Sequence, residues 1–112
     1  MTVYKEVMTS QLEAKSYISY KQLYLLEDEY DAVYLGYPFK VSKTEYFILK
    51  ALINNAPKPL SAEKIAISLP LDIKASNIVY HICRINERAN QIGNRYLIKN
   101  ISKKGYFLNE EM

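Results

Sequence analysis

The sequence has few of the residues that build disulfides, metal sites and phosphate-binding loops. Its single cysteine, Cys83, excludes an internal disulfide, and its single histidine, His81, leaves no cysteine–histidine cluster for zinc. Three glycines are too few for a glycine-rich phosphate loop. One histidine, one cysteine and no paired carboxylates within a recognisable motif leave no set of catalytic residues to assign. We therefore expect a protein that is not an enzyme and that has no cofactor and no metal.

Long apolar segments are also missing. No run approaches the roughly 18 uninterrupted apolar residues of a membrane helix, and the polar N-terminus lacks the apolar core of a signal peptide. Hydrophobic residues make up 49% and charged residues 24% of the 112 residues, as in a folded domain. We expect a cytoplasmic protein without a membrane partner. It would have an arm of uncertain structure at 1–15 and one domain over 16–112.

Charge is distributed unevenly along a chain whose net charge is +3. Residues 1–31 carry three lysines against six acids, which gives −3, whereas residues 72–108 carry seven basic groups against two acids, which gives +5. An acidic front and a basic back allow one positive face to meet a polyanion. Charge alone slightly favours an ordinary distribution of surface charges over a binding face. The order of the predicted helices and strands is needed to distinguish the two.

The first half of the domain predicts a sheet followed by two helices. Short β-branched and aromatic runs separated by turn residues predict a small antiparallel sheet over 17–41. The tetrapeptide from Ser42 to Glu45 has the pattern of a capping box, which predicts a helix over about 43–55. Ser61 is placed to cap a short helix over 62–68.

A third helix is predicted over 76–91, with Ser76 as its cap. Apolar residues recur on one side of it, at Ile78, Ile82, Ile85, Ala89 and Ile92, and this side is expected to pack on the core. The opposite side carries polar residues, at Asn77, Tyr80, Arg84, Arg88 and Gln91, with His81 on the flank. Two arginines one turn apart repel each other, and a phosphate partner would turn this repulsion into attraction.

Residues 96–108 predict a β-hairpin with Lys103 and Lys104 at its tip. Helix, short helix, longer helix and basic hairpin in this order make an α+β fold, a winged helix-turn-helix. A helix about 10–12 Å wide fits the major groove of DNA. A hairpin with a cationic tip can reach phosphates or the adjacent minor groove. The elements therefore favour double-stranded DNA as the partner.

Three segments resemble the OmpR/PhoB-type winged-helix DNA-binding domain of two-component response regulators. Val41 to Leu52 is similar to the family's "LT-x-x-E-x-x-LL-x-x-L", Ser76 to Ile85 to "V-D-V-H-I-x-R-L-R", and Leu97 to Leu108 to "I-x-T-V-R-G-x-GY-x-L". With the β-rich run, the resemblance covers roughly residues 17–108. It implies an N-terminal four-stranded antiparallel sheet, three helices and a C-terminal β-hairpin wing.

The resemblance also implies a DNA-binding surface. Arg84 matches the base-contacting arginine, and residues 76, 77, 80 and 81 match positions that usually meet the phosphate backbone. In the wing, Asn100 and Ser102 match DNA-contacting positions, and Gly105-Tyr106 matches the pair that shapes the return strand. With the neighbouring cations, the candidate DNA-binding residues are Ser76, Asn77, Tyr80, His81, Arg84, Arg88, Lys99, Asn100, Ser102, Lys103, Lys104 and Tyr106.

The sequence departs from the family pattern at several of these positions. Val79 replaces a common Asp, Asn86 and Ser102 each replace a common Arg, and Glu87 brings an acid near the reading face. We therefore expect that the affinity for DNA, and the DNA sequence that is recognised, differ from those of the family. The family also joins this domain to a receiver domain, and too few residues precede the sheet here for one. An excised effector domain and a stand-alone protein both remain open.

The sequence supports two functions. The first is a sequence-specific, double-stranded DNA-binding transcription regulator, with helix 76–91 in the major groove and the wing 96–108 on the adjacent backbone or minor groove. It would form a homodimer on DNA, and its loop 69–75 matches a segment through which some family members touch RNA polymerase. The alternative is a winged-helix protein-interaction module that binds a regulator or a polymerase subunit. Glu87 and the acidic front favour this alternative, and so do the tyrosines of that front, Tyr24, Tyr30, Tyr34 and Tyr37.

Overall fold

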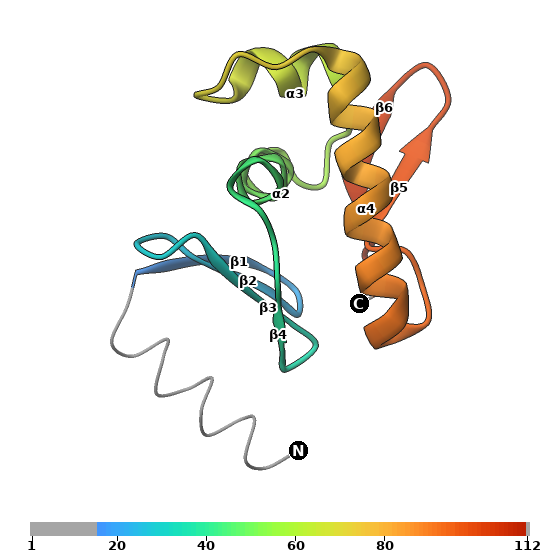
Figure 1. Ribbon diagram of the computed structural model, residues 1–112. Coiled ribbons are helices and arrows are strands. Elements are labelled where there is room, and N and C mark those ends of the chain that lie inside the picture. Colours follow the sequence, from blue (N-terminus) through green and yellow to red (C-terminus); the bar gives the residue numbers. More distant parts are fainter. Residues whose placement is uncertain (1–15, 112) are drawn as a thin grey trace.

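The computed structural model describes residues 16–111, so the arm predicted at 1–15 lies outside the described residues. A four-stranded sheet is followed by three helices and a two-stranded hairpin (Figure 1). This arrangement confirms the predicted α+β winged helix-turn-helix. The elements are β1 (Tyr17–Tyr20), β2 (Leu23–Leu26), β3 (Asp31–Tyr34), β4 (Tyr37–Phe39), α2 (Lys43–Asn55), α3 (Ala62–Ser68), α4 (Ala75–Gly93), β5 (Ile98–Ile101) and β6 (Gly105–Leu108).

The N-terminal sheet is an antiparallel meander in the order β1-β2-β3-β4. Leu35 and Gly36 connect β3 to β4 and both have positive φ, 54° and 82°, as a two-residue type I′ turn requires. The last strand of the sheet, β4, begins at Tyr37. It contains Pro38, which has no amide to donate, and β4 tolerates it because it is an edge strand.

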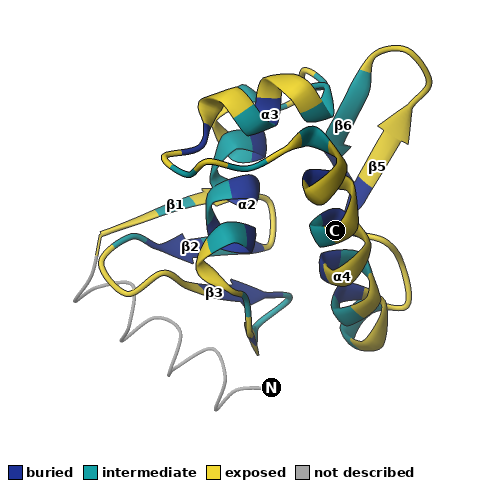
Figure 2. Ribbon diagram, turned by 45° about the horizontal axis from the view of Figure 1, so that its top comes forward, coloured by how far each residue is buried: buried dark blue, intermediate teal, exposed yellow. Residues whose placement is uncertain are grey.

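Helix α2 lies between the sheet and the other two helices (Figures 1 and 2). Its capping box is present as predicted, since the Ser42 side chain accepts from the Glu45 amide and the Glu45 side chain accepts from the Ser42 amide. Several of its apolar side chains are buried in the core, at Tyr46, Ile48, Leu49 and Leu52. Burial raises the pKa of the hydroxyl of Tyr46 to about 12, and it also raises the pKa of the sheet residue Tyr34.

Helix α4 buries its predicted apolar face, with Ile78, Ile82, Ile85 and Ala89 inside the core. The predicted cap at Ser76 is wrong. The helix begins earlier, because Lys74 has extended backbone angles and its carbonyl accepts from the amides of residues 77 and 78, at 3.0 and 3.2 Å. At its other end Asn94 takes the left-handed conformation, with φ 57°.

The hairpin β5–β6 is joined to the rest of the fold through the segment before α3. Leu60 pairs with Tyr106 through two backbone hydrogen bonds, of 2.8 Å from the Leu60 amide and 2.7 Å from the Tyr106 amide. A side chain at Gly105 would not fit beside this pairing. Its φ is 120°, and an added Cβ would lie 2.3 Å from the Leu60 carbonyl oxygen. Glycine is therefore required where the return strand begins.

None of the helices within residues 16–111 is both long enough and apolar enough to cross a membrane.

Candidate nucleic-acid interface

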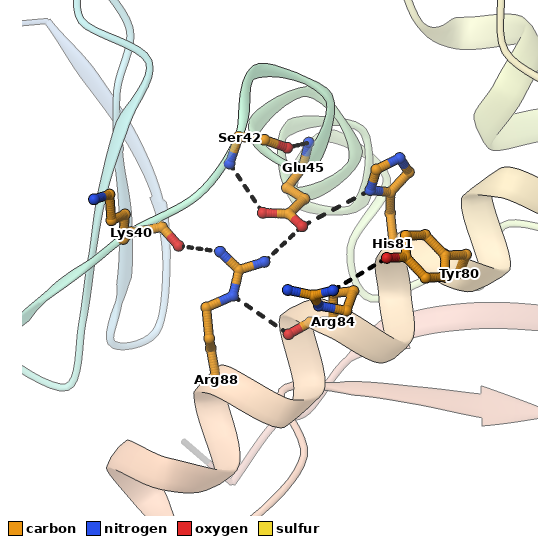
Figure 3. Close-up of polar contacts among 7 residues, drawn as sticks. All are labelled: Lys40, Ser42, Glu45, Tyr80, His81, Arg84 and Arg88. Atoms are coloured by element: carbon orange, nitrogen blue, oxygen red, sulfur yellow. Dashed lines mark hydrogen bonds and ion pairs between the residues drawn. The ribbon is translucent and has the colours of Figure 1, made fainter.

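The outward face of α4 presents Arg84 to solvent. Its Nη1 donates a hydrogen bond of 3.1 Å to the Tyr80 hydroxyl, one helical turn earlier (Figure 3). The guanidinium carbon lies 5.9 Å from the centre of the Tyr80 ring, and the tyrosine itself is 56% exposed. One donor of the guanidinium is therefore occupied, and the remaining donors have no partner among residues 16–111.

Arg88, one turn further along, does not share this arrangement. Its Nη2 lies 2.5 Å from Oε2 of Glu45, and its Nη1 donates to the carbonyl of Lys40 (Figure 3). The side chain is 30% exposed. Arg88 therefore holds α4 against α2 and the end of the sheet, and its guanidinium is turned away from the position that the sequence predicted for it.

Glu45 is the centre of this network, and its side chain is only 6% exposed. One carboxylate oxygen accepts from the Ser42 amide at 2.9 Å, and the other faces both Arg88 and the Nδ1 of His81, the latter at 3.8 Å. Burial by itself would raise the pKa of this carboxyl. The hydrogen bonds from Arg88 and Ser42, together with the charges of Arg88 and His81, hold the pKa below its usual value.

His81 lies beside this network rather than on the outward face. Its side chain is 26% exposed, and its ring centre is 5.4 Å from that of Tyr80. The buried Nδ1 has no hydrogen-bond partner within the described part of the chain, although Glu45 is near. A proton on this nitrogen would be attracted by the carboxylate.

The wing presents three basic side chains to solvent, one on strand β5 and two at its tip. Lys99, Lys103 and Lys104 are all exposed, and none of them pairs with an acid among residues 16–111. Lys103 has φ 68°, and the Lys104 amide closes the turn on the Ile101 carbonyl at 3.0 Å. Unpaired cations on a protruding hairpin can meet phosphate oxygens at little cost in lost internal contacts.

Asn86 fixes the wing to α4, a role that the sequence analysis missed. Its side-chain amide donates to the Ile98 carbonyl at 2.9 Å and its side-chain oxygen accepts from the Ile98 amide at 2.8 Å. A groove of about 380 Å³ lies between helix and wing, with Val79, Cys83 and Tyr96 among its lining residues. A polar residue beside the buried face of a helix was the available signal for Asn86.

The predicted residues fall into two exposed groups and three less exposed side chains. On α4 the exposed group comprises Ser76, Asn77, Tyr80 and Arg84, and on the wing it comprises Lys99, Asn100, Ser102, Lys103 and Lys104. His81, Arg88 and Tyr106 are partly covered. The tyrosines predicted for a protein-binding surface need one correction. Tyr34 is fully buried in the core against Phe39, because its strand position faces the helices, whereas Tyr30 is 43% exposed.

The described residues contain no group of three or more His, Cys, Asp or Glu side chains that could hold a metal ion.

No protein-family model matches the sequence, and no curated protein matches it. Solved structures do match its fold. The DNA-binding domain of the response regulator AdeR, in complex with an intercistronic region, is 18% identical with a TM-score of 0.71, over 81% of this chain and 96% of that one. The C-terminal effector domain of BfmR from Acinetobacter baumannii is 25% identical with a TM-score of 0.63, over 85% and 91%.

A longer protein matches as well. The response regulator DrrB of Thermotoga maritima, an OmpR/PhoB homologue, is 21% identical with a TM-score of 0.66, and the match covers 93% of this chain. This chain spans only 52% of DrrB. The chain has the fold of the OmpR/PhoB-type response-regulator DNA-binding domains.

Proposed function

We propose that the protein is a sequence-specific, double-stranded DNA-binding transcription regulator. Helix α4 would lie in the major groove and the β5–β6 wing on the adjacent backbone or minor groove. The observation that carries the proposal is the exposed Arg84 on α4, accompanied by three unpaired lysines on the wing. The same fold in the AdeR domain is bound to an intercistronic region, which supports DNA as the ligand class.

The chemistry of the exposed groups suits a duplex. An arginine can donate two parallel hydrogen bonds to O6 and N7 of guanine, the commonest specific contact in the major groove. Lysines at the end of a hairpin supply sequence-independent attraction to phosphates. Arg84 is therefore assigned the reading of bases, and the wing lysines are assigned the positioning of the protein along the backbone.

A binding titration tests this function. Purified protein would be used to select bound duplexes from a random pool, and the affinity for a recovered duplex would be measured by fluorescence anisotropy at several salt concentrations. We expect salt-sensitive binding that is at least about a thousandfold tighter than binding to an unrelated duplex. Absence of salt-sensitive binding by the intact protein would contradict the proposal.

Two partners follow from the same function. A homodimer on DNA predicts that the selected duplexes contain two half-sites, as direct repeats for head-to-tail subunits or as an inverted repeat for two-fold pairing. RNA polymerase is proposed as a contact through the 69–75 loop, beside which Ile67 is 84% exposed. We place the function in the cytoplasm.

The alternative is a protein-interaction module with this fold. It is favoured by the exposed Ile67 and by Tyr30, which lies in the acidic segment between β2 and β3. A pull-down with the intact protein separates the two functions. A partner that is lost in Tyr30→Ala or Ile67→Ser but kept in Arg84→Ala, with no DNA selected from a random pool, would favour the alternative.

A further inference from the structure

Glu87 is an acid on the outward face of α4, three residues after Arg84. It is exposed, and it forms no hydrogen bond or ion pair with any residue between 16 and 111. The adjacent Arg88 does not neutralise it, because the Arg88 guanidinium is bound to Glu45 and to the Lys40 carbonyl. The proposed DNA-reading face therefore carries a carboxylate whose oxygens have no partner in the described part of the chain.

A free carboxylate is unfavourable near phosphates, which repel it. It becomes favourable only where a donor meets it, and the major-groove donors are the amino groups of cytosine and adenine. Cytosine N4 presents a lone donor that suits a carboxylate, whereas adenine also presents the N7 acceptor, which repels one. Cytosine is therefore the base that this side chain fits.

The spacing of the two side chains places them on neighbouring bases. Three residues of α-helix rise about 4.5 Å and leave the side chains about 60° apart around the axis. This rise is close to the separation of successive base pairs, about 3.4 Å. Arg84 and Glu87 can therefore reach the same base pair or two adjacent ones without any change in the helix.

We infer that Glu87 is a specificity-determining residue that accepts a hydrogen bond from N4 of a cytosine, at or next to the base pair whose guanine is contacted by Arg84. This inference rests on the proposed function and names the sequence class that the same site reads. The recognised sequence then contains a G·C pair at the position read by Arg84. Glu87 lowers the affinity for every duplex because it repels phosphates, and this loss is offset only where a cytosine amino group meets the carboxylate.

The test measures binding of the intact protein to a selected duplex and to every single-base-pair variant of it. Arg84→Ala identifies the base pair read by Arg84, as the position where discrimination is lost. Glu87→Gln and Glu87→Ala are then measured on the same duplexes. Glu110→Gln is the matched control, because it removes the same charge from another exposed acid, after β6.

We expect wild type to prefer cytosine at or beside the Arg84 position by about tenfold. Glu87→Ala should lose this preference while binding unrelated duplexes more tightly. Glu87→Gln should shift the preference towards adenine, because a glutamine amide pairs with N6 and N7 of adenine. Glu110→Gln should change no base preference.

The inference is overturned if both Glu87 variants change the affinity for all duplexes by one common factor, or if wild type shows no cytosine preference at or beside the position read by Arg84. Failure of wild type to select any duplex is a separate outcome, and it would overturn the proposed function itself.

Discussion

A single buried carboxylate determines the different roles of two neighbouring arginines. Glu45 accepts hydrogen bonds from the start of its own helix and from Arg88 of α4. Arg84 forms no ion pair with an acid among residues 16–111 and stays on the surface against Tyr80. The capping role of Glu45 could be predicted from the sequence, because it involves residues three positions apart. The binding of Arg88 could not, since a helical periodicity does not show which acid another element will bring near.

Replacing Glu45 by Gln should reduce stability and its dependence on acid pH. The folded-state pKa of Glu45 lies below its unfolded value, so the ionised carboxylate stabilises the protein above the usual carboxyl pKa. This contribution is lost as the pH falls through the lowered folded-state pKa. Urea unfolding of wild type and Glu45→Gln between pH 7 and pH 3 would measure it. Equal pH dependence in the two proteins would contradict this account of Glu45.

The two arginines of α4 should respond differently to alanine. Arg84→Ala should weaken specific DNA binding by about 1–3 kcal/mol and leave the unfolding free energy nearly unchanged. Arg88→Ala should lower the unfolding free energy by roughly 1–3 kcal/mol, because Glu45 loses its charged partner in a buried place. Urea unfolding and anisotropy titrations on both variants would separate the effects. Destabilisation by Arg84→Ala alone would reverse the assignment.

The helices and strands can largely be predicted from local patterns in the sequence. The alternating runs, the serine caps of α2 and α3 and the apolar side of α4 all depend on neighbours in sequence. The start of α4 is different, since Ser76 is the better local cap and Lys74 takes the position without a side-chain bond. Leu71 and Ile73 pack against the core just before it, so tertiary contacts fix the chain there.

Asn86→Ala should loosen the wing without unfolding α4. It removes both hydrogen bonds to Ile98 and leaves a partly buried backbone amide and carbonyl unpaired, at a cost of about 2 kcal/mol. Hydrogen exchange followed by NMR should show lower protection of the Ile98 amide. Asn100→Ala, in the exposed part of the same strand, is the control and should leave it unchanged. If the Ile98 amide were equally protected in Asn86→Ala and in wild type, Asn86 would not be the residue that attaches the wing to α4.

Lys103 occupies a turn position that its side chain does not favour. Its φ of 68° suits asparagine better than lysine, so Lys103→Asn should keep or raise the melting temperature. The same change removes one cation from the wing. If that cation meets a phosphate, the plot of log affinity against log salt should lose roughly one unit of slope. A lower melting temperature with an unchanged slope would contradict both expectations.

For the molecule as a whole, the sequence showed where the charge lies along the chain but not which cations would remain free. Among the basic groups near the C-terminus, Arg84 and the wing lysines are unpaired with acids among the described residues, whereas Arg88 is bound to Glu45 and Arg95 lies 3.6 Å from Glu111. The distribution of charged residues along the sequence therefore indicated a positively charged surface. The positions of the acids in the folded chain decide how much of that charge is available.

Removing all three wing lysines together should weaken binding to every duplex alike. Lys99→Ala, Lys103→Ala and Lys104→Ala in one protein should lower the salt slope by up to about three units while preserving the ranking of duplexes, because phosphate contacts carry no base information. Anisotropy titrations at four salt concentrations would measure this. A changed ranking would mean that the wing reads bases.

The wing is attached at its base from two sides, by Asn86 on Ile98 and by the pairing of Leu60 with Tyr106. Helix and hairpin are thereby set at one separation before any duplex arrives. Little conformational freedom has to be given up on docking, which leaves more of the contact energy as affinity. Because the separation of helix and hairpin is fixed, we expect the protein to bind much more weakly to a DNA site in which one extra base pair separates the parts contacted by the helix and the wing.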